Sequence, residues 1–206
     1  MKRKLAVFFV VLCFTFSIIQ TFAQDTTYTV RYGDTMWKIA AKYQVGISEI
    51  IAKNPQVKNP ALIYPGQKLT IPNINDVKAW ENEVVRLTNI ERSKRGLQTL
   101  TTNWQLSRVA RYKSQDMINK NYFDHQSPTY GSPFNMMESF GLRFSAAAEN
   151  IAMGQQSPQE VMNAWMNSPG HRSNILSPAY TQIGVGLAKD KYGRCYWTQH
   201  FMKPAM

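Results

Sequence analysis

Two histidines and one glutamate stand in three short polar stretches in the second half of the chain. His125 lies within residues 123–128, Glu149 within 148–152 and His171 within 168–174. Two neutral imidazoles and one carboxylate form a fair ligand set for a divalent metal, zinc included, with water in an open position. Glu149 is also the candidate general base of this set. The plainer alternative is that His125, like most lone histidines, has a structural role.

A turn is expected to present His171. Pro169 fixes its own φ and Gly170 permits a positive φ, so 168–170 is predicted to be a turn that ends the preceding helix. That helix is expected to begin at the capping box of 157–160 and to end near Asn167. The turn would aim the imidazole outward, toward the other two polar stretches.

The elements around these stretches predict a mixed fold. Helices are expected over 78–95 and 103–120, and a short one is expected to start at Ser132–Pro133. Strands are expected over 181–188 and 194–202, joined by a turn at 190–193. Because the helices come early and the hairpin late, the sequence favours an α+β fold or a three-layer sandwich.

The three polar stretches, in this order and spacing, resemble the bacterial branch of the CAP superfamily (cysteine-rich secretory proteins, antigen 5, pathogenesis-related 1). The segments 87–92 and 183–186 extend the resemblance, which covers residues 80–203. It implies an α-β-α sandwich with a cavity formed by His125, Glu149 and His171. Ser168 stands where the family has a second carboxylate, so the resemblance implies weaker metal binding. His200, in an aromatic strand, is interpreted as structural.

The sequence lacks the motifs that are typical of several kinds of enzyme. Ser168 and Ser173 lie near His171, but no nucleophile elbow surrounds them, and no HExxH motif is present. Cys195 has no signature typical of cysteine proteases. Because the CAP fold hosts many activities, three hypotheses stay open. The favoured one is a non-enzymatic wall-binding or regulatory protein. The others are a metal-dependent hydrolase of peptidoglycan or peptide, and a lipid-binding protein.

The first 23 residues are predicted to be a signal peptide and not part of the fold. Lys2, Arg3 and Lys4 precede an apolar run that continues to Ile19, and 21–23 fit the small-x-small cleavage pattern. The run is short for a bilayer span of about 20 residues, so we expect a secreted protein that meets the membrane only through this segment. Its removal leaves Cys195 as the single cysteine, so an internal disulfide is excluded.

Residues 27–73 predict a small module with the order βααβ. Tyr28 opens the first strand, and the segment 68–72 closes the module. The module resembles a LysM domain along its whole length. Matching segments are 28–30, 33–35, 37–40, 54–55 and 64–69. The resemblance implies binding of N-acetylglucosamine glycans such as peptidoglycan. The implied contact residues are Gly33, Asp34, Thr35, Met36, Leu62, Ile63, Tyr64 and Pro65.

A short polar joint, 74–79, is expected between the two modules, which should sit close together with limited freedom. The formal charge of the whole chain is +11. Nucleic acid is not favoured as the reason, because no arginine-rich stripe is present and the protein is exported; an anionic wall fits better. The sequence thus predicts a protein at the cell wall or spore wall, with a wall or spore protein as a further partner.

Overall fold

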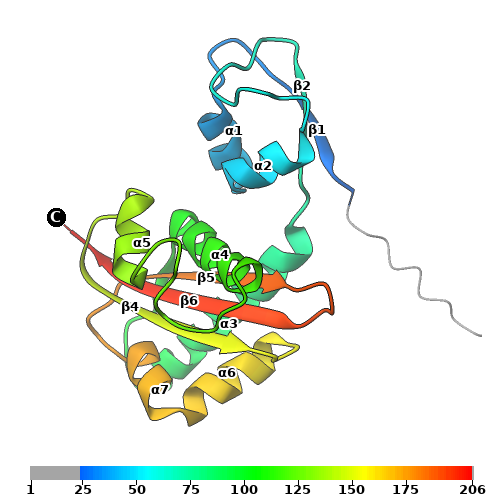
Figure 1. The fold of residues 1–206 in the computed structure, drawn as a ribbon. Helices are drawn as coiled ribbons and strands as arrows, with labels where there is room; N and C mark the ends of the chain where they lie inside the picture. Colours follow the sequence, from blue (N-terminus) through cyan, green and yellow to red (C-terminus); the bar gives the residue numbers. More distant parts are fainter. Residues whose placement is uncertain (1–23, 206) are drawn as a thin grey trace, which may run out of the picture.

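The computed structural model describes residues 24–205. Two modules follow one another along the chain, and Figure 1 shows the smaller one beside the helical surface of the larger one. The predicted signal peptide, 1–23, lies outside the described residues. Within 24–205 no helix has both the length and the apolar character needed to cross a membrane.

The first module has the expected βααβ order. Its elements are β1 (Thr26–Thr29), α1 (Met36–Tyr43), α2 (Ile47–Lys53) and β2 (Lys68–Ile71). β1 and β2 pair antiparallel. Thr35 caps α1 by accepting a hydrogen bond from the backbone N–H of Lys38. A separate small core, which includes Ile39, Ile50 and Leu69, fills the space between the helices and the strands.

The second module is built on a four-stranded sheet with the order β3-β5-β6-β4. Its strands are β3 (Thr101–Thr102), β4 (Phe144–Met153), β5 (Gln182–Lys189) and β6 (Cys195–Pro204). The long strand β6 lies in the interior of the sheet, paired antiparallel with β4 on one side and with β5 on the other. The β5–β6 hairpin confirms the expected turn, in which Gly193 adopts a φ of 78°.

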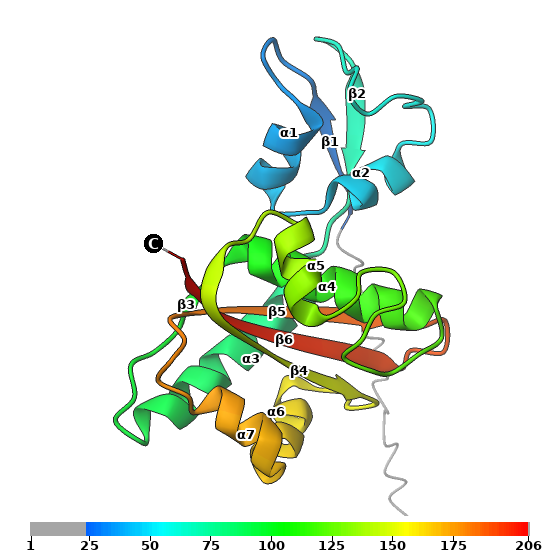
Figure 2. The same ribbon diagram turned by 60° about the vertical axis from the view of Figure 1, so that its left-hand side comes forward.

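Helices cover both faces of this sheet, as Figure 2 shows. The helices are α3 (Asn75–Ser93), α4 (Trp104–Asn119), α5 (Pro133–Ser139), α6 (Pro158–Asn167) and α7 (Pro169–Ile175). α4 and α5 lie on one face, and α3, α6 and α7 lie on the other. The core between the sheet and α3 and α6 includes the fully buried rings of Trp165 and Trp197. The fold is therefore α+β, an α-β-α sandwich behind a βααβ module.

Two glycines let α4 lie very close to the sheet. A Cβ atom at Gly184 would overlap the backbone of Leu106 and Ser107, and one at Gly186 would overlap that of Ala110 and Arg111. Glycine is therefore required at both positions of β5, because any side chain would push α4 away from the sheet. This close packing matters for the site, since α4 holds the loop that carries His125.

The structure differs from the sequence prediction in three places. Strand β4 was not expected, because the alanines of 146–148 have low β propensity; pairing with β6 overrides that preference. The predicted turn at 168–170 is only one residue long, since Pro169 and Gly170 are the first residues of α7 and His171 is helical. The predicted joint 74–79 is helical from Asn75 onward, so α3 continues almost to the end of the first module.

Candidate functional site

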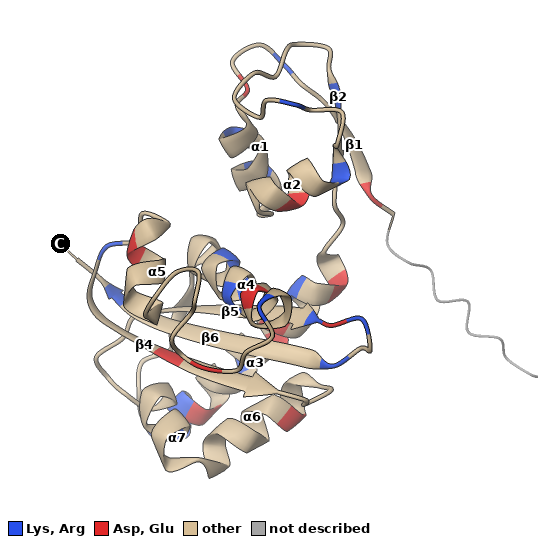
Figure 3. Cartoon of the chain, in the orientation of Figure 1, with Lys and Arg blue, Asp and Glu red and all other residues tan. Residues whose placement is uncertain are grey.

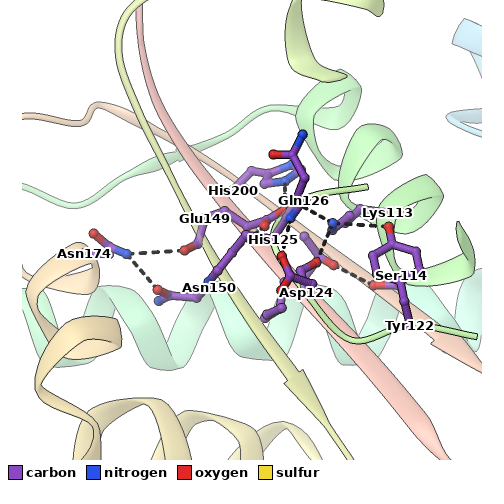
Figure 4. Close-up of polar contacts among 12 residues, drawn as sticks. Lys113, Ser114, Tyr122, Asp124, His125, Gln126, Glu149, Asn150, Asn174 and His200 are labelled. Atoms are coloured by element: carbon purple, nitrogen blue, oxygen red, sulfur yellow. Dashed lines mark hydrogen bonds and ion pairs between the residues drawn. The ribbon is translucent and has the colours of Figure 1, made fainter. Parts of the chain in front are cut away.

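Glu149 lies at the centre of the candidate site, between two histidines. One carboxylate oxygen is 2.7 Å from Nδ1 of His125 and the other is 2.8 Å from Nε2 of His200. The carboxylate is almost fully buried, His200 is completely buried, and about half of the His125 side chain is exposed. Figure 4 shows this arrangement, with His125 entering from a loop and the other two from strands.

Strand register places His200 against Glu149. The two residues are direct partners in the antiparallel pair β4–β6, so their side chains lie on the same face of the sheet. His200 Nδ1 is buried and makes no hydrogen bond within residues 24–205. A buried N–H without an acceptor is costly, so we assign the proton of His200 to Nε2, which donates it to Glu149. Sequence reasoning took His200 as structural and missed this contact.

Lys113 of α4 holds the loop that carries His125 through its ammonium group. Lys113 is fully buried, and its Nζ donates to the backbone carbonyls of Asp124 and His125, at 2.7 and 2.8 Å. It also donates to the hydroxyl of Tyr122 at 3.2 Å. These bonds replace the water that the ammonium group loses on burial. They fix the backbone of His125 relative to α4.

Asp116, one helical turn further along α4, holds the rest of the same loop. Its carboxylate accepts hydrogen bonds from the hydroxyls of Tyr122, Ser127 and Thr129, each at 2.7 Å. Burial alone would raise the pKa of Asp116, but these three donors outweigh burial and leave the pKa below its usual value. Lys113 and Asp116 thus turn a loop without regular structure into a fixed support for His125.

Helix α7, which carries His171, lies against strand β4, and the imidazole of His171 is not among the hydrogen-bond partners of the Glu149 carboxylate. Asn150 donates to the backbone carbonyl of His171 at 3.2 Å, and Asn174 donates to the side-chain oxygen of Asn150 at 2.9 Å. Asn174 also reaches the carbonyl of Glu149 at 3.3 Å. These amide contacts tie α7 to β4, although Asn150 and Asn174 had no role in the sequence prediction.

Charge distinguishes His125 from His171. The hydrogen bond that His125 donates to Glu149 raises the pKa of His125 above its ordinary value, although burial opposes the shift. Burial lowers the pKa of His171, and the nearby charge of His125 lowers it further. Burial would raise the pKa of Glu149, but the hydrogen bonds from His125 and His200 outweigh it and leave that pKa low. Protonation of His125 is therefore favoured over protonation of His171.

The predicted zinc ligands do not fit a three-residue metal site. Both oxygens of Glu149 are taken by imidazoles, so the carboxylate would have to give up one of them before it could bind a metal. Over residues 24–205 no three His, Cys, Asp or Glu side chains come together as a ligand group. Ser168, which replaces the second carboxylate of the family pattern, supplies no anionic ligand, as the sequence already indicated.

What the arrangement can do chemically follows from the tautomer of His125. Because Nδ1 donates to Glu149, the neutral ring carries its free lone pair on Nε2. A carboxylate that orients an imidazole in this way is a recurring acid–base pair in enzymes. The hydroxyl of Ser173, a candidate nucleophile by sequence, instead donates to the carbonyl of Gly170 at 2.7 Å.

The first module places the predicted glycan residues on two adjacent loops. Backbone bonds join the loops at their base, where Val30 donates to Gln67 and accepts from Gly66, each at 2.9 Å. Most of the eight predicted positions are exposed or partly exposed. Met36 is the exception: its side chain is 4% exposed and lies in the core, so it can offer only its backbone.

A shallow hollow of about 380 Å³ lies beside the second loop. Leu62 and Tyr64 line it, with exposed fractions of 55% and 63%. The predicted positions 33–36 do not line this hollow. Asp34 is already engaged, since one of its oxygens accepts from the hydroxyl of Tyr28 and from the backbone N–H of Arg31.

Family models match both modules. Residues 85–201 match the CAP model, described as the cysteine-rich secretory protein family, and residues 28–72 match the LysM domain. An uncharacterized protein of Bacillus subtilis, YkwD, is 58% identical over 128 residues, which cover 62% of this chain and 49% of YkwD. The chain thus spans about half the length of this relative.

Two other proteins are similar to different shares of the chain. A crystal structure of an extracellular SCP-domain protein from Bacillus anthracis is 32% identical with a TM-score of 0.58, covering 68% of this chain and 47% of that one. The spore coat assembly protein ExsA of Bacillus cereus is 48% identical over 44 residues, which cover 21% of this chain and 7% of ExsA. The model match over more than half of the sequence shows that the chain belongs to the cysteine-rich secretory protein (CAP) family and carries a LysM domain before its CAP domain.

Proposed function

We propose that this is a secreted protein of the cell wall, held by its LysM domain on the N-acetylglucosamine glycan of peptidoglycan. The observation that carries the proposal is the LysM match, together with the exposed aromatic ring of Tyr64 beside a shallow hollow. A flat ring can cover the apolar face of a sugar, while backbone groups of the two loops can bond its acetamido group. No transmembrane anchor is needed for this attachment.

The charge of the chain fits a wall location. Lysine and arginine outnumber aspartate and glutamate by 24 to 13. Figure 3 shows basic residues on both modules. A net positive surface is attracted by anionic polymers of the bacterial wall. The CAP domain would then bind or regulate a wall partner, and the likeness of a 44-residue segment to the spore coat assembly protein ExsA supports a spore-wall setting.

Pull-down with insoluble peptidoglycan tests the attachment. We expect the secreted chain to sediment with peptidoglycan and Tyr64→Ala to bind much less, because the substitution removes the exposed ring. Tyr192→Ala is the matched control, since Tyr192 is 78% exposed on the CAP hairpin. Equal loss in the two variants, or no loss in Tyr64→Ala, would contradict the assignment of Tyr64 and its hollow to glycan binding.

A second candidate function is hydrolysis of peptidoglycan or of a peptide. The observation that favours it is the bond between His125 and Glu149, which prepares Nε2 of His125 as a base without a metal. Incubation of purified peptidoglycan with the protein should then release soluble fragments. Glu149→Gln should abolish release, because the amide cannot stabilise a protonated His125. Release that is unchanged in Glu149→Gln would exclude this site as its source.

A further inference from the structure

Helix α4 presents an aromatic and basic face to the LysM domain. The ring of Trp37, on α1, lies 5.8 Å from that of Trp104 at the start of α4. The guanidinium carbon of Arg108 is 4.8 Å from the Trp37 ring and 5.7 Å from the Trp104 ring. Nε of Arg108 makes no hydrogen bond within residues 24–205, so ring faces are its main partners on this side.

A second contact joins the start of α2 to the middle of α4. The hydroxyls of Ser48 and Tyr112 are hydrogen-bonded to each other across the two domains. Gly46 faces the same tyrosine, and a Cβ atom at Gly46 would overlap its hydroxyl. The φ of Gly46 is −77°, a value that any residue adopts. The absence of a side chain here therefore serves close approach to Tyr112 and not the backbone of the turn.

The third contact lies at the carboxyl end of α1. Lys78 donates to the carbonyl of Tyr43 at 2.8 Å, and Arg111 reaches the carbonyl of Gln44 at 3.4 Å. Arg111 is itself fixed by buried Glu81, with Nε 3.1 Å from the carboxylate. The last carbonyls of a helix have no partners inside it and carry partial negative charge, so cations from the CAP domain stabilise this end of α1.

We propose that the outer face of α4 is a docking surface for the LysM domain, so that the exposed loops proposed to bind glycan and the His125–Glu149 pair are held in one fixed relative orientation. The surface consists of Trp104, Arg108, Arg111 and Tyr112. Aromatic, close-packed and charged contacts act together there, and the two domains are joined through Asn73 and Ile74 with no flexible linker. The LysM domain then holds a fixed position relative to the CAP domain and does not move independently of it.

The direction of docking leaves the glycan loops accessible. Figures 1 and 2 both show α1 and α2 facing the CAP domain, with the loops before α1 and before β2 at the far end of the LysM domain. The loop before β2, which carries Tyr64, therefore lies away from the docking surface, whereas Trp37 directly follows Met36 at the end of the first loop. A wall-bound protein would present the His125–Glu149 pair of its CAP domain at a set angle to the glycan strand.

NMR relaxation of backbone amides in the full secreted chain tests the proposal. We expect amides of both domains to report one common rotational correlation time. Gly46→Leu should shorten the correlation time of LysM amides alone, because its side chain collides with Tyr112. Tyr32→Ala is the control, since it removes an aromatic ring that is 96% exposed on the same module, and it should leave the common time unchanged.

Arg108→Ala provides an independent variant on the CAP side, in case Gly46→Leu disturbs the LysM fold. It should also separate the two correlation times while the chemical shifts of both cores stay dispersed. A soluble N-acetylglucosamine oligomer should leave the common time intact. Separate correlation times in the wild-type chain would overturn the proposal. So would a common time that persists in both docking variants, or one that the oligomer abolishes.

Discussion

Glu149 and His200 face each other across the β4–β6 strand pair, with Oε2 of the carboxylate 2.8 Å from Nε2 of the imidazole. Both side chains are essentially removed from water. The contact supplies a hydrogen-bond donor to one oxygen of the buried carboxylate and leaves its other oxygen for His125. The fully buried His200 thus holds Glu149 in place, and Glu149 in turn orients the half-exposed His125.

Replacement of His200 should destabilise the domain through Glu149. His200→Phe keeps a ring but removes the donor, so the buried carboxylate loses a hydrogen bond, at a cost of about 1–3 kcal/mol. His200→Gln retains an N–H donor and should cost less. Denaturant unfolding of the two variants measures the difference. An equal loss of unfolding free energy in both would show that ring packing, and not the bond to Glu149, determines stability here.

The bond between His125 and Glu149 should make stability depend on pH in a defined window. The pKa of His125 is raised, so its contribution is present below the ordinary value of 6.5 and is lost as pH rises through the folded pKa. The pKa of Glu149 is lowered, so its contribution is present above 4.5 and is lost as pH falls through the folded pKa. The difference in unfolding free energy between wild type and His125→Ala should therefore be largest between pH 4.5 and pH 6.5.

His171 should show the opposite acid dependence. Its pKa is lowered on folding, so the folded state resists its protonation, and stability is lost as pH falls through its ordinary value of 6.5. His171→Ala should remove this loss, so the variant should gain relative to wild type in mild acid. Thermal unfolding at a series of pH values checks both histidines. Parallel pH curves for all three proteins would contradict the assigned charges.

Zinc should not bind tightly to His125, Glu149 and His171 in the folded protein. Coordination by Glu149 would break its bond to either His125 or His200, and Ser168 offers no replacement carboxylate. Calorimetric titration of the secreted chain with zinc is the measurement, and His171→Ala is its control. Stoichiometric binding that disappears in His171→Ala would show that the imidazoles of His125 and His171 suffice for a metal and would overturn our interpretation.

Removal of the Lys113 ammonium should loosen the loop that carries His125. Lys113→Met fills most of the buried space but leaves the carbonyls of Asp124 and His125 without their donor, at a cost of about 1–3 kcal/mol. Hydrogen exchange of loop amides should increase more than exchange in β6. Lys120→Met, at the exposed end of the same helix, should change neither property. Unchanged exchange in Lys113→Met would mean that Asp116 alone holds the loop.

Much of the architecture was accessible from the sequence because it depends on local signals. Turn residues such as Gly33 and Gly66, both with positive φ, mark the loops of the first module. Asn103 and Ser132 cap the helices that follow them, as expected. The same short-range patterns carry the two family resemblances, and the family models confirm both. Strand β4 escaped prediction because neighbouring strands, and not its own alanines, decide its conformation.

The sequence by itself determined which residue types were available for chemistry and which two domains carry them. Only the tertiary structure decided that the second carboxylate oxygen of Glu149 accepts a hydrogen bond from His200, 51 residues away, and that the outer face of α4 contacts the LysM domain. Strand register and domain docking join residues that are distant in the chain. Such contacts arise from the packing of whole elements, so no local pattern around His200 or Trp37 encodes them.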